Sequence, residues 1–314
     1  MTTRNKGLLI MGLLLGSLFL LQSASQGANP QQVAMLRWYE SNSFLPAIST
    51  GEEPYGIAFD GANMWVVNWH DLTVSKIRVS DGVTLGTYTV GSLSAGIAFD
   101  GVNVWVANSF GATVTKIRAR DGHTIGTYPT GNYPWQVAFD GDYIWVSNHV
   151  DNTVTKLRAS SGANLGTFTV GNHPKGIAAI KNYIWVTSYT DGTVTKLSRG
   201  GIVVGTFAVG GCPNHIAFDG TSVWVTNGSD NTVSKLSQAG TLRGAYDVGN
   251  TPDGVAFDGE NIWVANTGSH TVTKLNLSGN LIGTYSVGES PRQIAFDGVN
   301  VWVTNNFDAT VSRR

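Results

Sequence analysis

The sequence predicts an all-β fold, namely a seven-bladed β-propeller with four-stranded blades. Three observations support this prediction: a unit of 39 or 40 residues occurs seven times, each unit contains four short segments of strand-forming residues, and the two chain ends together complete one unit. Four strands in about forty residues is the spacing of a propeller blade. The 314 residues also suit one closed domain, because closed β architectures often exceed the usual length of a single domain.

Each unit holds the same elements in the same order. The first strand ends in I-A-F-D-G, the second holds an apolar residue followed by W-V-x-N, the third reads T-V-T/S-K-I/L, and the fourth reads G-T-Y-x-V-G. β-branched and aromatic residues favour strands, and Gly or Asp-Gly between them favours hairpin turns with positive φ. The units begin at Ile57, Ile97, Val137, Ile177, Ile216, Val255 and Ile294.

One tryptophan of the second strand recurs in all seven units, and an aspartate before glycine recurs in six. A large aromatic side chain at a fixed position indicates packing between blades, so we assign the tryptophans a structural role. The aspartates are interpreted as turn residues, since a catalytic acid has no reason to occur six times. The residues are Trp65, Trp105, Trp145, Trp185, Trp224, Trp263 and Trp302, with Asp60, Asp100, Asp140, Asp219, Asp258 and Asp297.

The fourth unit departs from this pattern, because Ile180, Lys181 and Asn182 stand where the other units have the aspartate-glycine turn. Asparagine tolerates the left-handed conformation, so Asn182 is expected to adopt it. No function is assigned to this departure.

The chain ends predict how the ring closes. The last unit stops at Arg314, after its third strand at residues 310–313, and therefore lacks a fourth strand. Upstream of the first unit, residues 46–51 align with residues 86–91, the fourth strand of a complete unit. The N-terminal segment is therefore expected to supply the outer strand of the C-terminal blade, which removes an open sheet edge.

The first residues are typical of an export signal. Arg4 and Lys6 precede an apolar run at residues 7–21, and small residues follow it, so we predict a signal peptide at residues 1–25, a linker at 26–44 and the propeller at 45–314. The run is shorter than the roughly 20 residues that span a bilayer, although an uncleaved anchor remains the alternative. No cysteine lies near the cleavage site, which excludes a bacterial lipoprotein. The expected location is secreted or periplasmic in a bacterium, without stable membrane insertion after cleavage.

Composition restricts the partners. The net charge is -1 and the sequence contains no run of Lys and Arg, so no nucleic-acid partner is expected. Glycine contributes 39 residues and charged residues only 13%, as many tight turns and buried strands require. Cys212 is the single cysteine, so no intramolecular disulfide can form and packing must stabilise the chain, which we expect to be a monomer.

The repeats resemble those of the YVTN/NHL-type propellers, a superfamily that includes the streptogramin B lyases. The resemblance is carried by residues 54–61 (P-Y-G-I-A-F-D-G) and 263–275 (W-V-A-N-T-G-S-H-T-V-T-K-L) and covers residues 45–314. It implies a ligand site over one face, at the central channel. The lyases of this superfamily use a Glu-x-His pair with magnesium. Here Gly268 stands two residues before His270 and no Glu-x-His occurs, so the resemblance does not extend to that site.

Residues that vary between units indicate where a ligand would bind, because the common fold does not need them. In a propeller, the loop before the first strand and the loop between the second and third strands lie on one face. Five of the six histidines fall on that face, and the residues before each first strand should surround the channel mouth as Tyr55, Ala95, Trp135, Lys175, Asn214, Asp253 and Arg292. Aromatic residues with separated charges favour a polar ligand. The candidate ligand-binding residues are Tyr55, Trp69, His70, Trp135, His149, His173, Lys175, His215, Asp253, His270 and Arg292.

Other interpretations of these residues stay open. The histidines could bind a metal, but they are spread over five units and only neighbours such as His149 and His173 could approach one another. Cys212 is interpreted as a small, partly buried side chain rather than a nucleophile, since no histidine partner can be assigned. Trp69 and Trp135 could anchor a protein partner or could cover the loops beneath them.

The sequence therefore favours a secreted, non-catalytic binding or interaction scaffold, whose partner is a small molecule or a protein at the channel mouth. No catalytic residue, metal or cofactor is assigned. The alternative is a lyase or hydrolase that uses channel-mouth histidines. An enzyme should place one histidine and one carboxylate within about 3 Å of a common point, whereas a scaffold should show a broad exposed aromatic patch.

Overall fold

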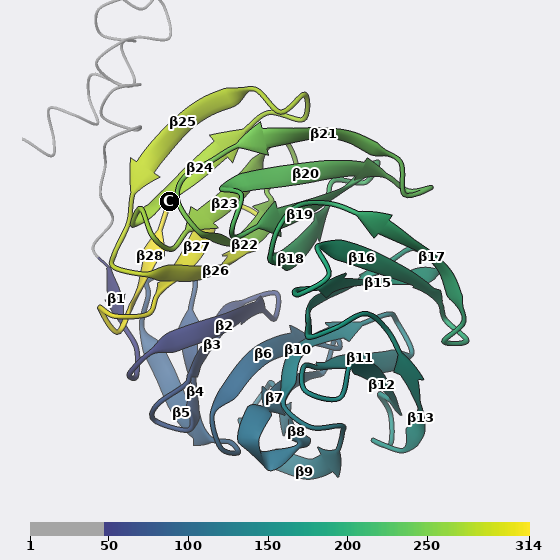
Figure 1. Cartoon of the computed structure of the whole chain (residues 1–314). Helices are drawn as coiled ribbons and strands as arrows, with labels where there is room; N and C mark the ends of the chain where they lie inside the picture. The colour runs from purple at the N-terminus through teal and green to yellow at the C-terminus, as the bar shows by residue number, and fades with distance from the viewer. Residues whose placement is uncertain (1–46) are drawn as a thin grey trace, which may run out of the picture. The chain divides into compact units, whose positions relative to one another are not determined.

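The computed structural model describes residues 47–314, which form seven four-stranded antiparallel sheets arranged as blades around a central axis (Figure 1). The predicted all-β seven-bladed propeller is confirmed. The proposed signal peptide at residues 1–25 and linker at 26–44 lie outside the described residues. Within the described part of the chain, a single short 3-10 turn, η1 (Ser109–Gly111), interrupts the strands, and no helix has the length and apolar character to cross a membrane.

Every blade runs from an inner strand beside the axis to an outer strand at the rim. Blade 1 holds β2 (Pro54–Phe59), β3 (Asn63–Asn68), β4 (Thr73–Arg78) and β5 (Thr84–Thr89); blade 2 holds β6 (Ser94–Phe99), β7 (Asn103–Asn108), β8 (Thr113–Arg118) and β9 (Thr124–Pro129). Blade 3 holds β10 (Pro134–Phe139), β11 (Tyr143–Asn148), β12 (Thr153–Arg158) and β13 (Asn164–Thr169); blade 4 holds β14 (Pro174–Ile180), β15 (Tyr183–Ser188), β16 (Thr193–Ser198) and β17 (Val203–Ala208). Blade 5 holds β18 (Pro213–Phe218), β19 (Ser222–Asn227), β20 (Thr232–Ser237) and β21 (Leu242–Asp247); blade 6 holds β22 (Pro252–Phe257), β23 (Ile262–Asn266), β24 (Thr271–Leu275) and β25 (Leu281–Ser286). Blade 7 holds β26 (Pro291–Phe296), β27 (Val301–Asn305), β28 (Thr310–Arg313) and the N-terminal β1 (Ile48–Ser49).

The ring closes as the chain ends predict. Strand β1 pairs antiparallel with β28, with Ile48 opposite Val311, and the backbone N–H of Thr50 donates to the carbonyl of Ala309 at 2.9 Å. Ile48 also packs against the apolar cluster that contains Trp302 and Val311. The N-terminal segment thus joins blade 7 by hydrogen bonds and by apolar burial (Figure 1).

The recurrent tryptophans pack between neighbouring blades, as predicted. Trp65 of blade 1 lies in one buried cluster with Ile97 and Val104 of blade 2, and the other six occupy equivalent clusters. A buried indole of this size contributes roughly 4–6 kcal/mol of gross apolar burial. The blade interfaces are therefore dominated by one repeated side chain.

The recurrent aspartates are turn residues, and they also bind the tryptophans. In blade 1, Asp60 Oδ1 accepts from the backbone N–H groups of Ala62 and Asn63 at 2.9 and 2.7 Å, while Oδ2 accepts from the indole N–H of Trp65 at 2.7 Å. The repeated lysine completes the unit: Lys76 Nζ lies 5.3 Å from the Trp65 ring and donates to the Ala119 carbonyl of blade 2 at 2.6 Å. Each unit of this kind leaves no polar atom of the tryptophan unpaired.

Blade 4 corrects one prediction. Lys181, with φ 54°, takes the left-handed conformation that was expected at Asn182. Strand β14 has seven residues and pairs Ile180 with Tyr183, so the turn contains only Lys181 and Asn182. Lys181 occupies the repeat position of Gly61, whose φ is 97°. The conformation therefore follows the position in the hairpin and not the residue that tolerates it best.

A shift in the inner strands positions the candidate site. In blade 1 the pairing between β2 and β3 jumps from Pro54 to Ile57, and all seven inner strands show the same irregularity. Tyr55 and Gly56 are therefore outside the regular ladder at the channel. A bulge of this kind changes the direction of the side chains it contains, so each blade presents two consecutive residues near the axis.

Candidate functional site

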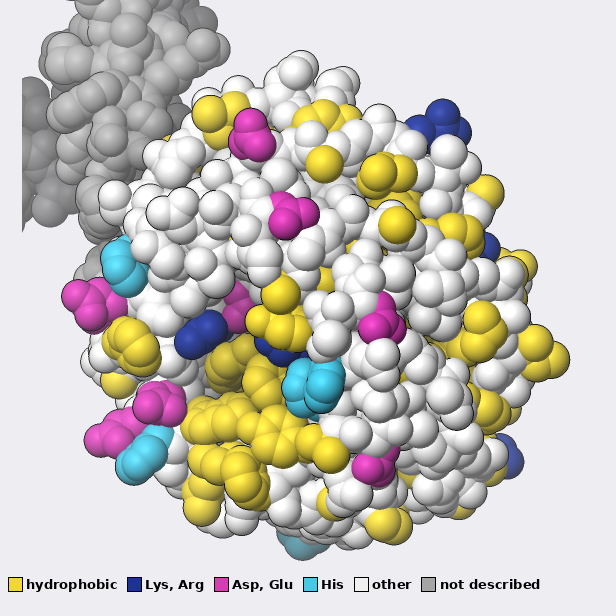
Figure 2. All heavy atoms as spheres, viewed as in Figure 1, with side chains coloured by type: hydrophobic (Ala, Val, Ile, Leu, Met, Phe, Trp, Pro, Cys, Tyr) yellow, Lys and Arg dark blue, Asp and Glu magenta, His cyan; other side chains and the backbone are white. Residues whose placement is uncertain are grey.

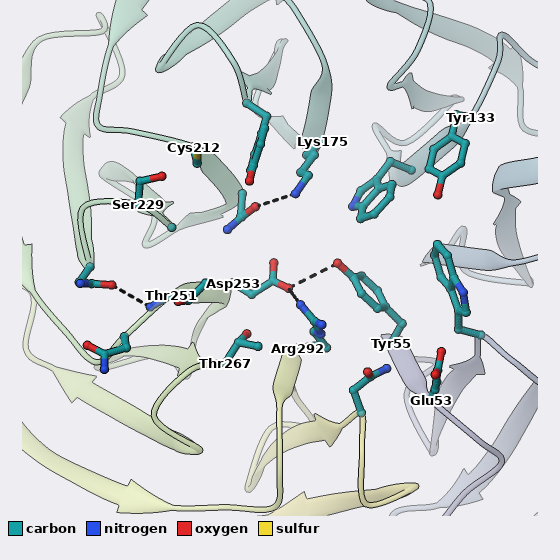
Figure 3. A pocket seen from close by; sticks show the side chains of 18 residues that line it. Glu53, Tyr55, Tyr133, Lys175, Cys212, Ser229, Thr251, Asp253, Thr267 and Arg292 are labelled. Carbon is teal, nitrogen blue, oxygen red and sulfur yellow. Dashed lines mark hydrogen bonds and ion pairs between the residues drawn. The ribbon is translucent and has the colours of Figure 1, made fainter.

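A cavity of about 1000 Å³ occupies the predicted channel mouth (Figure 3). Of the seven predicted mouth residues, six line it, whereas Ala95 is fully buried. This volume lies at the upper end of the range for small-molecule sites. The lining residues are Glu53, Tyr55, Trp69, Tyr133, Trp135, Lys175, Tyr189, Cys212, Asn214, Gly228, Ser229, Asn231, Asn250, Thr251, Asp253, Thr267, Arg292 and Asn306.

Four aromatic side chains from blades 1 and 3 form one side of the cavity, which we call the aromatic wall: Tyr55, Trp69, Tyr133 and Trp135. Trp135 lies at its centre, with ring centroids 5.8 Å from Tyr55, 5.9 Å from Trp69 and 5.7 Å from Tyr133. Figure 2 shows hydrophobic side chains gathered beside the axis over these blades. The Trp135 indole nitrogen is buried and has no hydrogen-bond partner among residues 47–314.

Asp253 is the centre of charge at the base of the cavity. It is only 5% exposed, and its carboxylate accepts from His215 Nδ1 at 2.9 Å and from the Tyr55 hydroxyl at 3.4 Å, with Arg292 Nη1 at 3.6 Å. Burial opposes ionisation, but the His215 hydrogen bond and the charges of Arg292 and Lys175 together lower the pKa of Asp253. The same burial and the Asp253 charge raise the pKa of Tyr55 well above 10.0. Asp253 is therefore a carboxylate and Tyr55 a neutral donor.

Lys175 lies beside this centre, between aromatic rings. Its ammonium is 3.7 Å from the centroid of Tyr189 and 5.2 Å from that of Trp135, and it donates to Asn214 Oδ1 at 3.2 Å (Figure 3). Burial lowers the pKa of Lys175 below 10.5, while the Asp253 charge opposes this change. Lys175 is thus a partly desolvated cation with aromatic neighbours, an arrangement that strengthens its interaction with an anion.

Small polar residues of blades 5–7 form the opposite side, which we call the polar wall: Asn214, Ser229, Asn231, Asn250, Thr251, Thr267 and Asn306. Only Asn214 had been placed at the mouth from the sequence. The others lie in loops where Asn, Ser and Thr also serve as turn formers, so their residue types alone did not distinguish a site. The polar wall faces the aromatic wall across Asp253 and Arg292 (Figure 3).

A second polar layer lies in the channel beneath the cavity. Gln293 Nε2 donates to His215 Nε2 at 3.0 Å and to Gln136 Oε1 at 3.5 Å, so side chains of blades 3, 5 and 7 meet across the axis. Both ring nitrogens of His215 are therefore engaged within the protein, Nδ1 by Asp253 and Nε2 by Gln293. The sequence contained a signal for this layer, because the position after each mouth residue is glycine in four blades and one of these three large polar residues in the others.

The predicted histidines do not converge on the cavity. His215 is 6% exposed and lies below it, while His70, His149, His173 and His270 are absent from its lining. His70 contacts Glu52 at 2.9 Å, and His270 Nδ1 accepts from the backbone N–H of Ser290 at 3.0 Å. Burial, together with the Lys175 charge, lowers the pKa of His149 to about 4. Its ring packs 5.5 Å from that of Trp135 and therefore supports the aromatic wall from behind.

The structure places two of the predicted histidines beside each other and a third, His70, in a group that could hold a metal ion. His149 and His173 approach to 4.9 Å between ring centroids, as the sequence allowed, but within residues 47–314 the single group of three metal-type ligands is Glu52, His70 and Asp71, all exposed. Cys212 is partly buried and lines the cavity. A hydrogen bond with Cys212 raises the pKa of Tyr189.

The fold is shared with solved propellers. The chain is similar to a streptogramin B lyase structure, with 17% sequence identity and a TM-score of 0.75 over 85% of this chain and 96% of that one. It is similar to a catalytically inactive virginiamycin B lyase from Staphylococcus aureus with quinupristin (18% identity, TM-score 0.75, 85% and 97% covered). It is also similar to hydrazine synthase from Kuenenia stuttgartiensis (15% identity, TM-score 0.74, 85% and 96% covered).

These comparisons confirm the architecture that the repeats indicated. No known protein family matches the sequence, and no curated protein is significantly similar to it. At such low identities the likeness concerns the fold, and propellers of one fold have unrelated functions. The function of this chain therefore depends on the residues of the channel-mouth cavity.

Proposed function

We propose that this chain is a non-catalytic binding protein, secreted or periplasmic in a bacterium, whose ligand occupies the channel-mouth cavity. The observation that supports it most is the division of the cavity into an aromatic wall, a polar wall and a charged base. Such a surface offers stacking, hydrogen bonding and charge to one ligand at the same time. The recurrent tryptophans that join the blades do not line the cavity, so the framework of the ring and the site use different residues.

The charged base favours a ligand with an anionic group. Lys175 and Arg292 are two cations beside one carboxylate, Asp253. An anion between them would gain charge-assisted hydrogen bonds, while Trp135 would stack on a planar or apolar part of the same ligand.

A lyase or hydrolase is the second candidate, because His215 and Asp253 form a histidine–carboxylate pair at 2.9 Å. General acid–base catalysis requires a ring nitrogen within hydrogen-bond reach of the substrate. Gln293 engages the remaining nitrogen of His215, and His215 does not line the cavity. The geometry thus favours binding, with the pair serving to hold Asp253 in place.

A thermal-shift screen of the full chain against metabolites tests the binding function. A cavity ligand should raise the melting temperature of the wild type and fail to do so in the double variant Trp135→Leu, Arg292→Gln. The variant His123→Gln, on the opposite face, should respond like the wild type. A ligand whose effect depends on His123 but not on the cavity pair would show that the wrong face has been chosen, and turnover that is lost in His215→Asn would favour the enzyme.

The proposed location has its own test. N-terminal sequencing of exported protein should find a start near Gln26, after signal cleavage. Retention of Met1 in a membrane fraction would contradict both the cleavage and the soluble location.

A further inference from the structure

The Arg292 guanidinium has unused hydrogen-bonding capacity. It is 29% exposed, its Nε is buried without a partner among the described residues, and its closest charged contact is the 3.6 Å approach to Asp253. A guanidinium offers five N–H donors in a planar arrangement that suits a carboxylate. Arg292 therefore lines the cavity with its terminal nitrogens free of any hydrogen bond within the described residues.

The charge around Arg292 matches a single negative group. The charge of Arg292 lowers the pKa of Lys175, so the two cations are near enough to repel one another. The negative charge of Asp253 offsets only one of them. Glu53 lies on the far side of Tyr55 from Lys175 (Figure 3). One carboxylate between Lys175 and Arg292 would complete the balance, whereas a polyphosphate would bring more negative charge than these two cations can offset.

The polar wall also has free groups. Within residues 47–314, the side-chain polar atoms of Ser229, Asn250 and Thr251 form no hydrogen bond to protein groups, although all three line the cavity. They are short, uncharged side chains that can both donate and accept. Such groups suit the hydroxyls of a ligand, which also donate and accept.

The aromatic wall extends beyond the cavity. Phe110, which is 64% exposed, packs 5.3 Å from Tyr133, and Tyr133 stacks on Trp135. Trp135, Tyr133 and Phe110 therefore form a continuous aromatic strip, which runs from the cavity out to the blade 2 loop. An aromatic surface of this length exceeds what one ring-sized group would cover.

We infer that the ligand is an oligosaccharide with a carboxylate-bearing sugar, whose carboxylate binds Arg292 and Lys175 and whose neighbouring sugars stack along the strip from Trp135 to Phe110. This rests on the proposed function and adds the chemical class of the ligand. A pyranose has apolar C–H faces that pack on aromatic rings and hydroxyls around its edge. It thus matches an aromatic wall that faces a wall of Asn, Ser and Thr. A peptide would instead need hydrogen bonds from protein main-chain groups. The cavity lining offers mainly side-chain groups.

Isothermal titration calorimetry with matched ligands tests the carboxylate. The full chain is titrated with short oligomers of galacturonate, glucuronate and mannuronate, and with their methyl esters, which keep the rings and hydroxyls but lose the charge. At least one acidic oligomer should bind with a Kd below about 1 mM. The Kd of its ester should be higher by a factor of about ten or more. Arg292→Gln should remove that preference, while Arg243→Gln, an exposed arginine of β21, should keep it.

The length of the strip is tested by two equivalent phenylalanines. Phe110 and Phe307 occupy the same loop position in blades 2 and 7 and are similarly exposed, at 64% and 67%, but Phe110 packs on Tyr133 and does not stand alone. Phe110→Ala should weaken binding of the longer oligomers by about threefold to tenfold and leave a single uronate unaffected. Phe307→Ala should change neither.

Several outcomes would overturn the inference. Equal affinity for acid and ester would show that no carboxylate of the ligand is recognised. Equal effects of Phe110→Ala and Phe307→Ala would show that the sugars do not stack along the strip. A third outcome is that no acidic oligomer binds, but another compound, such as a peptide with a free C-terminal carboxylate, stabilises the wild type and not the Trp135→Leu, Arg292→Gln variant. In that case the saccharide inference is wrong and the binding function stands. If no compound depends on that pair, both are wrong.

Discussion

The tryptophans of the blade interfaces and Trp135, at the centre of the aromatic wall, differ in how their indole nitrogens are hydrogen-bonded. At the interfaces, six indole N–H groups donate to an aspartate of the same blade at 2.7–2.9 Å, and a cation lies near each ring. Trp135 has a buried indole nitrogen without a partner. These six interface indoles are thus paired within the protein, whereas the Trp135 indole keeps its hydrogen-bonding capacity.

Blade 4 shows which part of the interface unit is essential. It has Ile180 in place of the aspartate, yet Trp185 is as buried as its counterparts, at 1% exposed. Arg199, in the loop between β16 and β17 of blade 4, binds Asp140 of blade 3 at 3.0 Å. Apolar burial thus maintains the interface, and the aspartate adds hydrogen bonds to it.

The largest expected effect is on ring closure. Deleting residues 47–50 from the full chain would remove the pairing of β1 with β28 and expose the edge of blade 7, so the free energy of unfolding should fall by at least about 3 kcal/mol. Ile48→Ala should cost about 1–3 kcal/mol. Ile202→Ala, a change at an exposed aliphatic residue, is the control and should cost almost nothing. A melting temperature of the deletion variant within one or two degrees of wild type would mean that closure contributes little.

The next effect concerns the interface aspartates. Asp219 is buried and accepts from Trp224, Thr221 and Ser222, so Asp219→Ala should cost about 2–3 kcal/mol in thermal or denaturant unfolding. Asp219→Asn keeps an acceptor for the turn but brings an amide N–H group near the indole N–H, and should cost about half as much. Equal losses in both variants would mean that the turn hydrogen bonds are unimportant and the indole bond carries the whole effect.

A smaller effect concerns the pH dependence of stability, which should differ between His149, behind the aromatic wall, and a surface histidine. The pKa of His149 is about 4 in the folded chain and about 6.5 when unfolded. The unfolded state therefore binds more protons between these values, and stability should fall as the pH falls from about 6.5 to about 4. The loss attributed to His149 is about 1–3 kcal/mol, measured as the difference in melting curves between wild type and His149→Gln. His123→Gln, at an exposed position on the opposite face, should leave the wild-type pH dependence intact.

The fold could be predicted in detail because the same pattern of four strands occurs seven times in the sequence. The alignment of residues 46–51 with residues 86–91 predicted that the N-terminal segment completes the last blade, and Ser49 indeed pairs with Thr310 in it. The turn of blade 4 was assigned to the wrong residue, since the hairpin position and not the amino-acid preference decides which residue takes positive φ. Lys181 shows that a strong tertiary pattern overrides a local preference.

The site could be predicted only as far as the mouth residues. Tyr55, Trp135, Lys175, Asp253 and Arg292 meet in the cavity because the inner strands converge and their bulges direct these side chains to the axis. The predicted histidines other than His215 share the face but lie in loops, where sequence spacing does not determine the direction of a side chain. The Gln136, His215 and Gln293 layer was missed because a bulge presents two consecutive residues to the channel, whereas a regular strand would present alternate ones.

The smallest effect should come from Arg292, and it decides whether this residue belongs to the framework or to the site. Its Nε has no partner among the described residues, and Asp253 keeps its bonds from His215 and Tyr55 without it. Arg292→Gln should therefore change the melting temperature by less than about 2 °C. Asp253→Ala should cost about 3 kcal/mol, because it leaves two buried donors unpaired. If Arg292→Gln proved as destabilising as Asp253→Ala, the arginine would be a structural partner of the carboxylate, and its donors would no longer be available to explain a bound anion.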